Sequence, residues 1–277
     1  MDVCLFYTPA LRLDSLLKKR HEIKSDTVVV DLEDSIHVHS KQAARQKVAE
    51  FDFEPLAAMG VKLAVRINTI ACFDGLADLE LLKSLYEKGR FYLQTILLPK
   101  VSHPNEVKIY RALLGTTPFR PKLYTFIETV EAVDNADGIA SVSDGLCFGQ
   151  ADLVSEMYSP NETFIDYARA RMCIAAAKYN LPSVDTNSFE IKDMNLFRKQ
   201  CLLAKSYGFT AKAAIHPDHV PCINDVFSVS PEAADKYRAS IDTYYASGEG
   251  FVIRDGEVIA PPFIAKAKKM LRFYEKS

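Results

Sequence analysis

The sequence lacks paired cysteines, a long apolar run and a strong net charge, and each absence argues against a class of protein. Its six cysteines are scattered without a CxxC pair, so neither a zinc ribbon nor a disulfide framework is predicted. No apolar run approaches the roughly 20 residues of a membrane-spanning helix, and the N-terminus does not resemble a signal peptide. A formal net charge of −2 gives no bulk reason to expect nucleic acid or an anionic membrane as partner. We therefore expect a cytoplasmic protein.

Short apolar runs alternate with longer amphipathic runs along nearly the whole chain, which is typical of repeated βα units around a parallel sheet. Helices are predicted over 40–51, 78–89, 167–179 and 194–208, the last ending at Gly208. Neither GxGxxG nor GxxxxGK[ST] follows the first strand, which disfavours an open doubly wound sheet. We therefore predict a closed (β/α)₈ TIM barrel, a mixed α/β fold. Its eight predicted strands span residues 3–7, 27–33, 62–67, 95–99, 122–127, 145–149, 181–185 and 211–215.

The chain continues beyond the eighth predicted strand with a different pattern. Residues 230–248 read as a helix, and GFVIRDGEVIA at 250–260 reads as a hairpin that turns at Asp255-Gly256. A terminal helix follows. We therefore divide the chain into a barrel domain over 1–228 and a C-terminal extension over 229–277, which we expect to pack on a neighbouring subunit.

Polar residues follow the predicted strands, and the carboxyl ends of the strands are where a barrel of this kind assembles its chemistry. For any single residue, an ordinary polar loop is an equal explanation. The convergence of the whole set nevertheless indicates a site. Its members are Tyr7, Thr8, Glu33, Asp34, Arg66, Asn68, Lys100, Glu128, Gln150, Asp152, Asp185, Thr186 and His216.

Glu128 and Asp152 follow consecutive predicted strands and form a pair of carboxylates. Mg²⁺ typically takes one or two protein carboxylates and completes its shell with water and substrate. The lack of a nearby Cys or His cluster disfavours zinc. We therefore predict a Mg²⁺ site at this pair; the alternative is that both carboxylates only form salt bridges with Lys100 and Arg66.

The stretch TVVVDLED runs from an apolar strand straight into acidic residues, and VRIN places Arg66 at the end of the next strand. Carboxylates beside a buried sheet are costly unless they are compensated. Glu33 and Asp34 would order the water molecules of the metal or pair with a cation. Arg66 would grip the carboxylate of an anionic substrate in bidentate fashion. A structural salt bridge from Arg66 to Glu33 or Asp34 is the alternative, and both roles can coexist.

Seven segments in order resemble the citrate lyase beta-subunit-like family, whose relatives include malyl- and citramalyl-coenzyme A lyases and class II pyruvate aldolases. The resemblance covers roughly residues 3–265. The segments are VVVDLEDSI, VRIN, LLPKV, IETVEAVDNA, DGLCFGQADL, YARARMCIAAAKYNLPSVDT and GFTAKAAIHPDHV.

This resemblance implies a (β/α)₈ barrel, commonly assembled as a homotrimer or hexamer, with Mg²⁺ held by Glu128 of the IET motif and Asp152 of the FGxxDL motif. It implies that Arg66 binds the carboxylate of an oxo acid such as oxaloacetate, pyruvate or glyoxylate. The implied reaction makes or breaks a carbon–carbon bond between that oxo acid and an acyl thioester. Contacts to substrate or coenzyme A are implied for Arg12, Lys100, Ile215, His216 and Pro217.

The sequence departs from the family pattern at three places. Ala260 stands where family members carry an aspartate that acts as the base, so Asp255, Glu257 or another group would have to move the proton. The arginine usual before the first strand is missing, and Ser40-Lys41 replaces a frequent Glu-Lys. These departures leave two alternatives to a citrate lyase beta type enzyme. One is an aldolase or citrate-forming synthase that acts on free oxo acids, and the other is a noncatalytic subunit that binds an oxo acid or an acyl carrier.

Overall fold

The computed structural model describes residues 2–19, 23–89, 92–159, 161–254 and 256–274. The chain divides into two compact units. The larger runs from Val3 to Val226, and the smaller takes in the described residues from Phe227 onward together with Asp2. Each unit is built from elements of its own and is described by itself.

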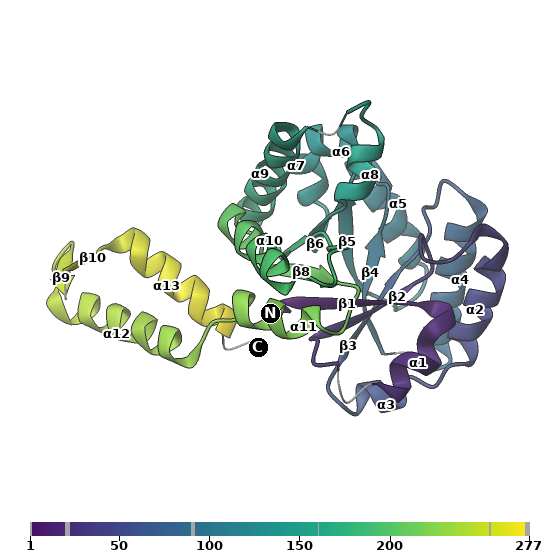
Figure 1. Ribbon diagram of the computed structural model, residues 1–277, viewed down its shortest axis with the longest axis horizontal. Coiled ribbons are helices and arrows are strands. Elements are labelled where there is room, and N and C mark those ends of the chain that lie inside the picture. The colour runs from purple at the N-terminus through teal and green to yellow at the C-terminus, as the bar shows by residue number, and fades with distance from the viewer. Residues whose placement is uncertain (1, 20–22, 90–91, 160, 255, 275–277) are drawn as a thin grey trace. The chain divides into compact units, whose positions relative to one another are not determined.

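Eight strands close into a barrel in chain order, and every neighbouring pair is parallel (Figure 1). This confirms the predicted fold class and all eight predicted strands, with ends that differ by only a few residues. The bounds are β1 Cys4–Pro9, β2 Thr27–Asp31, β3 Lys62–Arg66, β4 Leu93–Leu98, β5 Lys122–Ile127, β6 Gly145–Phe148, β7 Ser183–Asp185 and β8 Ala211–Ala214.

Helices surround the barrel. Two of the four predicted helices begin five residues earlier than expected, at Phe73 instead of 78 and at Glu162 instead of 167. In the second case Asn161 caps the helix by accepting a hydrogen bond from the Phe164 backbone N–H. The helices are η1 Ala10–Arg12, α1 Leu13–Lys18, η2 Val38–Ser40, α2 Lys41–Glu50, α3 Glu54–Ala57, α4 Phe73–Glu87, α5 Pro104–Leu114, α6 Val130–Asp134, α7 Ala136–Ala140, α8 Gln150–Ser155, α9 Glu162–Lys178, α10 Met194–Tyr207 and α11 His219–Phe227.

The interior of the barrel is a packed apolar core on which the polar strand ends rest. Inward side chains come from alternate positions of the strands, because successive residues of a strand point to opposite faces. The side chain of Tyr124 fills space that would otherwise hold a side chain at position 145, since a Cβ built on Gly145 would lie 2.7 Å from the ring. The cluster contains Leu5, Val29, Ala64, Leu97, Tyr124, Phe126, Cys147, Val184, Ala211 and Ala213.

The smaller unit contains α12 Pro231–Ser247, the antiparallel strands β9 Val252–Arg254 and β10 Glu257–Ile259, and α13 Pro261–Tyr274. The two helices pack against each other (Figure 1). The structure confirms the predicted hairpin, with Gly256 at a positive φ of 81°, a conformation that favours glycine; the predicted turn residue Asp255 lies outside the described residues. No described helix is both long and apolar enough to cross a membrane.

Candidate functional site

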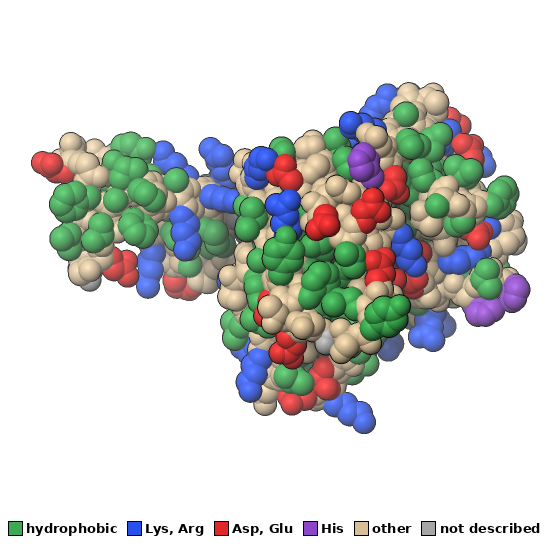
Figure 2. Space-filling model, turned by 90° about the horizontal axis from the view of Figure 1, so that it is seen from above, with side chains coloured by type: hydrophobic (Ala, Val, Ile, Leu, Met, Phe, Trp, Pro, Cys, Tyr) green, Lys and Arg blue, Asp and Glu red, His purple; other side chains and the backbone are tan. Residues whose placement is uncertain are grey.

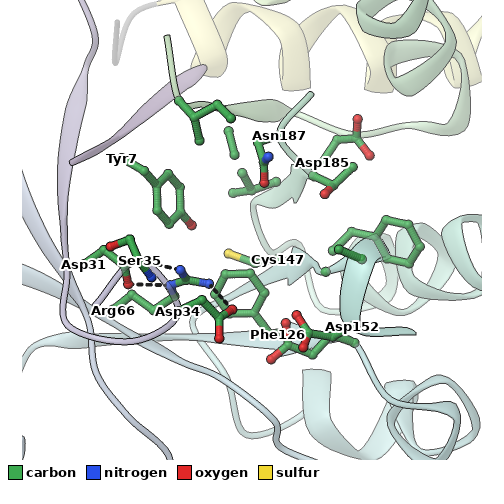
Figure 3. Close-up of a pocket in the computed structure, with 18 of the residues that line it drawn as sticks. Tyr7, Asp31, Asp34, Ser35, Arg66, Phe126, Cys147, Asp152, Asp185 and Asn187 are labelled. Atoms are coloured by element: carbon green, nitrogen blue, oxygen red, sulfur yellow. Dashed lines mark hydrogen bonds and ion pairs between the residues drawn. The ribbon is translucent and has the colours of Figure 1, made fainter. Parts of the chain in front are cut away.

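A cavity of about 430 Å³ opens at the carboxyl ends of the barrel strands. Five carboxyl groups line it against two guanidinium groups, so the lining carries an excess of negative charge. Figure 3 shows Arg66 and Asp31 on one side of the cavity and Asp185 and Asn187 across from them. The charged lining residues are Asp31, Asp34, Glu128, Asp152, Asp185, Arg12 and Arg66.

The outer surface differs from this lining in its balance of charge. On the face shown in Figure 2, acidic side chains in red lie among apolar side chains in green, with lysine and arginine side chains in blue close by. This mixture of signs agrees with the formal net charge of −2. On the face that Figure 2 shows, acidic residues are therefore accompanied by basic ones.

The structure brings most of the predicted site residues together. Nine of them line the cavity, and two more, Glu33 and Lys100, contact residues that line it. His216 and Pro217 do not line it, although Ile215 does. The nine lining residues are Tyr7, Arg12, Asp34, Arg66, Glu128, Asp152, Asp185, Thr186 and Ile215.

Glu128 directly follows β5 and is only 2% exposed. Its Oε1 accepts a hydrogen bond of 2.6 Å from the Lys100 backbone N–H, and Gly149 packs against its other side. Burial, together with the nearby Asp152 carboxylate, raises the pKa of Glu128 to about 8. A positive charge placed between these two carboxylates would therefore stabilise the ionised form of both.

Lys100 is held in an unusual backbone conformation, with a φ of +54°. Its Nζ lies 3.4 Å from Glu33 Oε1, 3.8 Å from Asp34 Oδ1 and 3.6 Å from Asp152 Oδ1. The predicted alternative, in which lysine pairs with the metal carboxylates, is thus present at Asp152. Because one ammonium group is shared among three carboxylates, the cluster still lacks positive charge.

Arg66 ends β3, and Asp31 lies opposite it in the register of the neighbouring strand β2. Nε and Nη2 of Arg66 each donate a hydrogen bond of 2.7 Å to Asp31, which makes a bidentate pair, and Nη1 lies 2.9 Å from Glu33 Oε2. Burial raises the pKa of Asp31, but the pairing with Arg66 outweighs it and leaves that pKa below the usual value. The guanidinium therefore makes the structural salt bridge that the sequence offered as an alternative.

Sequence reasoning placed Asp31 among the carboxylates of this stretch but did not identify it as the main partner of Arg66. In the structure the two residues close the neighbouring strands β2 and β3, whereas the predicted strands ran on to residues 33 and 67, so the sequence offered no signal that the two residues lie opposite each other. Glu33, which was expected to pair with a cation, does so with both Arg66 and Lys100. Burial and, to a smaller extent, the nearby Asp34 carboxylate raise the pKa of Glu33 to about 7.

The loop that carries these carboxylates is fixed from behind by backbone contacts. Lys41 Nζ donates to the carbonyl oxygens of Leu32, at 2.9 Å, and Glu33, at 2.7 Å. Asn68 Nδ2 also donates to the Leu32 carbonyl and to buried Asp78. The ammonium group of Lys41 thus holds the loop in place through the two carbonyl groups to which it donates.

The donor groups near Glu128 and Asp152 fit a hard divalent cation. Both offer oxygen atoms, and Mg²⁺ prefers oxygen and commonly takes only one or two protein carboxylates. Among the residues that the structure describes, no group of three or more His, Cys, Asp and Glu side chains could hold a metal. Glu128 and Asp152 both line the cavity and offer such oxygen atoms.

Gly149 makes room for Glu128, which leads to a testable prediction. A Cβ at position 149 would lie 2.2 Å from Glu128 Oε2, far inside contact distance. We expect Gly149→Ala to displace the carboxylate and remove Mg²⁺-dependent stabilisation in thermal melts. Gly250→Ala is the matched control, because nothing lies within 4 Å of a Cβ there. If Mg²⁺ raised the melting temperature of both variants equally, the close packing of Gly149 on Glu128 would not be needed for Mg²⁺ binding.

His216, predicted as a binding residue, lies in the loop after β8. Its side chain is 35% exposed, and its Nδ1 accepts a hydrogen bond from the Asp218 backbone N–H. His219, three residues further, is buried and stacks on Phe197 at 3.9 Å between ring centroids. Its ring contacts the Glu190 carbonyl, so this histidine belongs to the packing around the loop.

The chain is similar to known proteins over most of its length. The profile of the HpcH/HpaI aldolase/citrate lyase family matches residues 5–217. The chain is 27% identical over 276 residues to a (3S)-malyl-CoA thioesterase of Cereibacter sphaeroides, covering 96% of this chain and 92% of that protein. It is 24% identical over 278 residues to the mitochondrial citramalyl-CoA lyase of Rattus norvegicus, covering 92% and 81%. The solved structure of CitE from Mycobacterium tuberculosis, in complex with magnesium, acetoacetate and coenzyme A, shares the fold at a TM-score of 0.77 and 23% identity, covering 99% and 98%.

Proposed function

The chain belongs to the HpcH/HpaI aldolase/citrate lyase family, and on that premise we propose that it is a Mg²⁺-dependent carbon–carbon lyase or synthase. The reaction interconverts a 3-hydroxy acid, or its coenzyme A thioester, with an oxo acid and an acetyl unit. The observation that carries this proposal is the cavity with its five carboxyl groups around two guanidinium groups. Such a lining calls for a cation, and a chelated oxo acid would complete the coordination of that cation.

Glu128 and Asp152 are the residues that would hold Mg²⁺. When bound, the ion supplies Lewis acidity to the carboxylate and carbonyl oxygens of an oxo acid. Lys100 positions Glu128 through its backbone N–H and approaches Asp152 through its side chain. In CitE from Mycobacterium tuberculosis, magnesium is present with acetoacetate and coenzyme A, which accords with the oxygen donors found here.

Arg66 would orient the oxo acid by charge and by the one N–H of its Nη2 that the contacts with Asp31, Glu33 and Asp34 leave over. Its guanidinium lies 5.6 Å from the ring centroid of Tyr7 and 5.9 Å from that of Phe126, so two aromatic faces limit its movement. Phe126 and Phe148 line the same cavity and give it apolar surface beside the charged groups. Charge that develops on a bound oxo acid is then stabilised in surroundings of low dielectric.

The thioester would approach from the side of Arg12 and Ile215, which line the cavity and were both predicted to contact coenzyme A. Ala260 supplies no proton acceptor, because its side chain is a methyl group. Glu257 lies in β10 of the smaller unit. A group other than the side chain at position 260 therefore has to act as the base in any reaction that needs one.

Removing the metal gives a prediction about stability. A ligand that binds only the folded state raises the free energy of unfolding by mass action, by about 2.7 kcal/mol at roughly 100 times the dissociation constant. We expect the melting temperature to rise with Mg²⁺ and to fall back on addition of a chelator. If Glu128 and Asp152 only form salt bridges, the melting curves with Mg²⁺ and with chelator should coincide.

A thioesterase is the second candidate function, because a relative named (3S)-malyl-CoA thioesterase aligns over 96% of this chain. The two reactions differ in their products. Incubation with malyl-, citramalyl- or citryl-coenzyme A would release a free oxo acid and acetyl-coenzyme A in the lyase reaction. The thioesterase reaction would release a free thiol with the hydroxy acid intact. Following thiol and oxo acid in parallel separates the two, and a thiol without oxo acid would overturn the lyase proposal.

We also propose that the protein assembles as a homotrimer or hexamer through its C-terminal unit. The support is the set of large apolar side chains that this unit exposes, because such patches mark interaction surfaces. The mass in solution, measured by light scattering coupled to size exclusion, should be three or six times 31.0 kDa. A monomer at micromolar concentration would contradict the proposal. The exposed side chains are Tyr245, Phe251, Ile253, Val258 and Phe263.

A further inference from the structure

A second cavity, of about 650 Å³, adjoins the first between α8, α9, α10 and the segment after β7. The two cavities have four lining residues in common, Ala151, Thr186, Asn187 and Phe189, so they adjoin each other. The volume lies within the range that proteins use for small ligands. The second cavity thus extends the oxo-acid site away from Arg66 and Asp31, on the side where Figure 3 places Asp185 and Asn187.

An unbalanced group of charges lies where the two cavities adjoin, with Asp185 lining the first cavity and Arg169 and Lys212 lining the second. Asp185 is 1% exposed, and its Oδ2 accepts a hydrogen bond from the ammonium group of Lys212, which is 2% exposed. Arg169 approaches the other oxygen, with Nε 3.6 Å from Asp185 Oδ1, but makes no hydrogen bond with it. Two cations thus share one carboxylate, and a buried charge without full compensation destabilises the fold.

Arg169 is placed to receive an anion at its free end. Its Nε is buried beside Asp185, while Nη2 donates a hydrogen bond of 2.8 Å to Gln150 Oε1. The guanidinium lies 5.5 Å from the ring centroid of Phe148, which fixes its plane. Among the described residues, no hydrogen bond occupies Nη1. Glu162 and Asp166 on the α9 wall are exposed, so water screens their charges.

We propose that this second cavity binds the distal carboxylate of a dicarboxylic oxo acid, with Arg169 as the residue that selects it. The inference rests on the proposed function, since the oxo-acid end would lie near Glu128 and Asp152. Gln150 lines the second cavity and Asp152 lines the first. Both lie in the first turn of α8, so this turn borders both cavities. The amide of Asn187, which lines both, would hydrogen-bond the chain between the two ends.

Matched pairs of acids test the distal subsite directly. Each pair has equal chain length and differs only in a terminal carboxylate or methyl: freshly prepared oxaloacetate with 2-oxobutyrate, 2-oxoglutarate with 2-oxopentanoate, and 2-oxoadipate with 2-oxohexanoate. Dissociation constants are measured with Mg²⁺ by calorimetry for the full chain. We expect the wild type to prefer the diacid of at least one pair by tenfold or more. Arg169→Gln should lose this preference without weakening the monoacid.

Arg171→Gln is the control, because it removes the same charge two residues away on α9, where Arg171 Nη2 contacts the Asp134 carbonyl. Arg169→Lys keeps the charge and should recover part of the preference. If Arg169→Gln fails to fold, Asn187→Leu provides the second test, with the same loss expected.

Monoacid binding that depends on Glu128, without any diacid preference that depends on Arg169, would overturn this inference and leave the proposed function standing. Absence of binding by every acid would overturn both. If Arg171→Gln lost the preference for the diacid as fully as Arg169→Gln does, the selecting role of Arg169 would also be overturned.

Discussion

Glu128→Gln is expected to lower kcat for carbon–carbon bond cleavage by about 10³-fold, a barrier increase of about 4 kcal/mol. The substitution keeps the size of the side chain and an oxygen that can accept the Lys100 backbone N–H. It removes the negative charge that would hold Mg²⁺, and metal ions contribute several kcal/mol to catalysis of this kind. Turnover is measured with saturating Mg²⁺, and the melting temperature without Mg²⁺ checks that the fold is intact.

Glu131→Gln is the matched control, since Glu131 lies on α6 only three residues away and is exposed. It should retain wild-type turnover. A Glu128→Gln variant that turns over substrate within a few fold of the wild type would rule out Glu128 as a metal ligand.

Arg66→Met is expected to lower the free energy of unfolding by about 3–5 kcal/mol, the cost of leaving buried charges without their partner. Asp31 and Glu33 have side chains that are 3% and 7% exposed, and both pair with this one guanidinium. The loss should be measured by urea denaturation at neutral pH. Adding Asp31→Leu to this variant should recover part of the loss, because the orphaned carboxylate is then removed.

Arg111→Met provides the comparison for an exposed ion pair. Arg111 and Asp144 pair at 2.8 Å, but their side chains are 42% and 37% exposed. Exposed pairs contribute about 1 kcal/mol or less. Losses of equal size at positions 66 and 111 would show that the buried network around Arg66 does not stabilise the barrel.

The architecture was predictable because it depends on local patterns that repeat. Each strand is a short apolar run, and each is followed by a helical period, so eight repetitions sufficed to predict the closed barrel. The placement of Glu128 and Asp152 in one cavity followed from topology, because consecutive parallel strands bring both residues to one edge of the barrel. The hairpin at the C-terminal end was predictable from its turn residues and alternating flanks.

Other features depend on contacts that no local pattern records. The bidentate pair of Arg66 with Asp31 arises from the register between β2 and β3. Lys100 reaches three carboxylates because its backbone adopts a positive φ. Arg169 meets Asp185, which also pairs with Lys212, only when α9 packs against β7, so this group of charges could not be read from the order of residues.

The most direct test of the central claim is one NMR time course. Protein with Mg²⁺ is mixed with oxaloacetate, pyruvate or glyoxylate, each with and without acetyl-coenzyme A, beside Glu128→Gln as the inactive variant. We predict that a new hydroxy acid or hydroxyacyl thioester forms with the wild type alone, and that its identity names the oxo acid. If every mixture stays unchanged while the signals of an oxo acid broaden with the wild type, the protein binds that acid without catalysis, and the proposed lyase or synthase activity is contradicted.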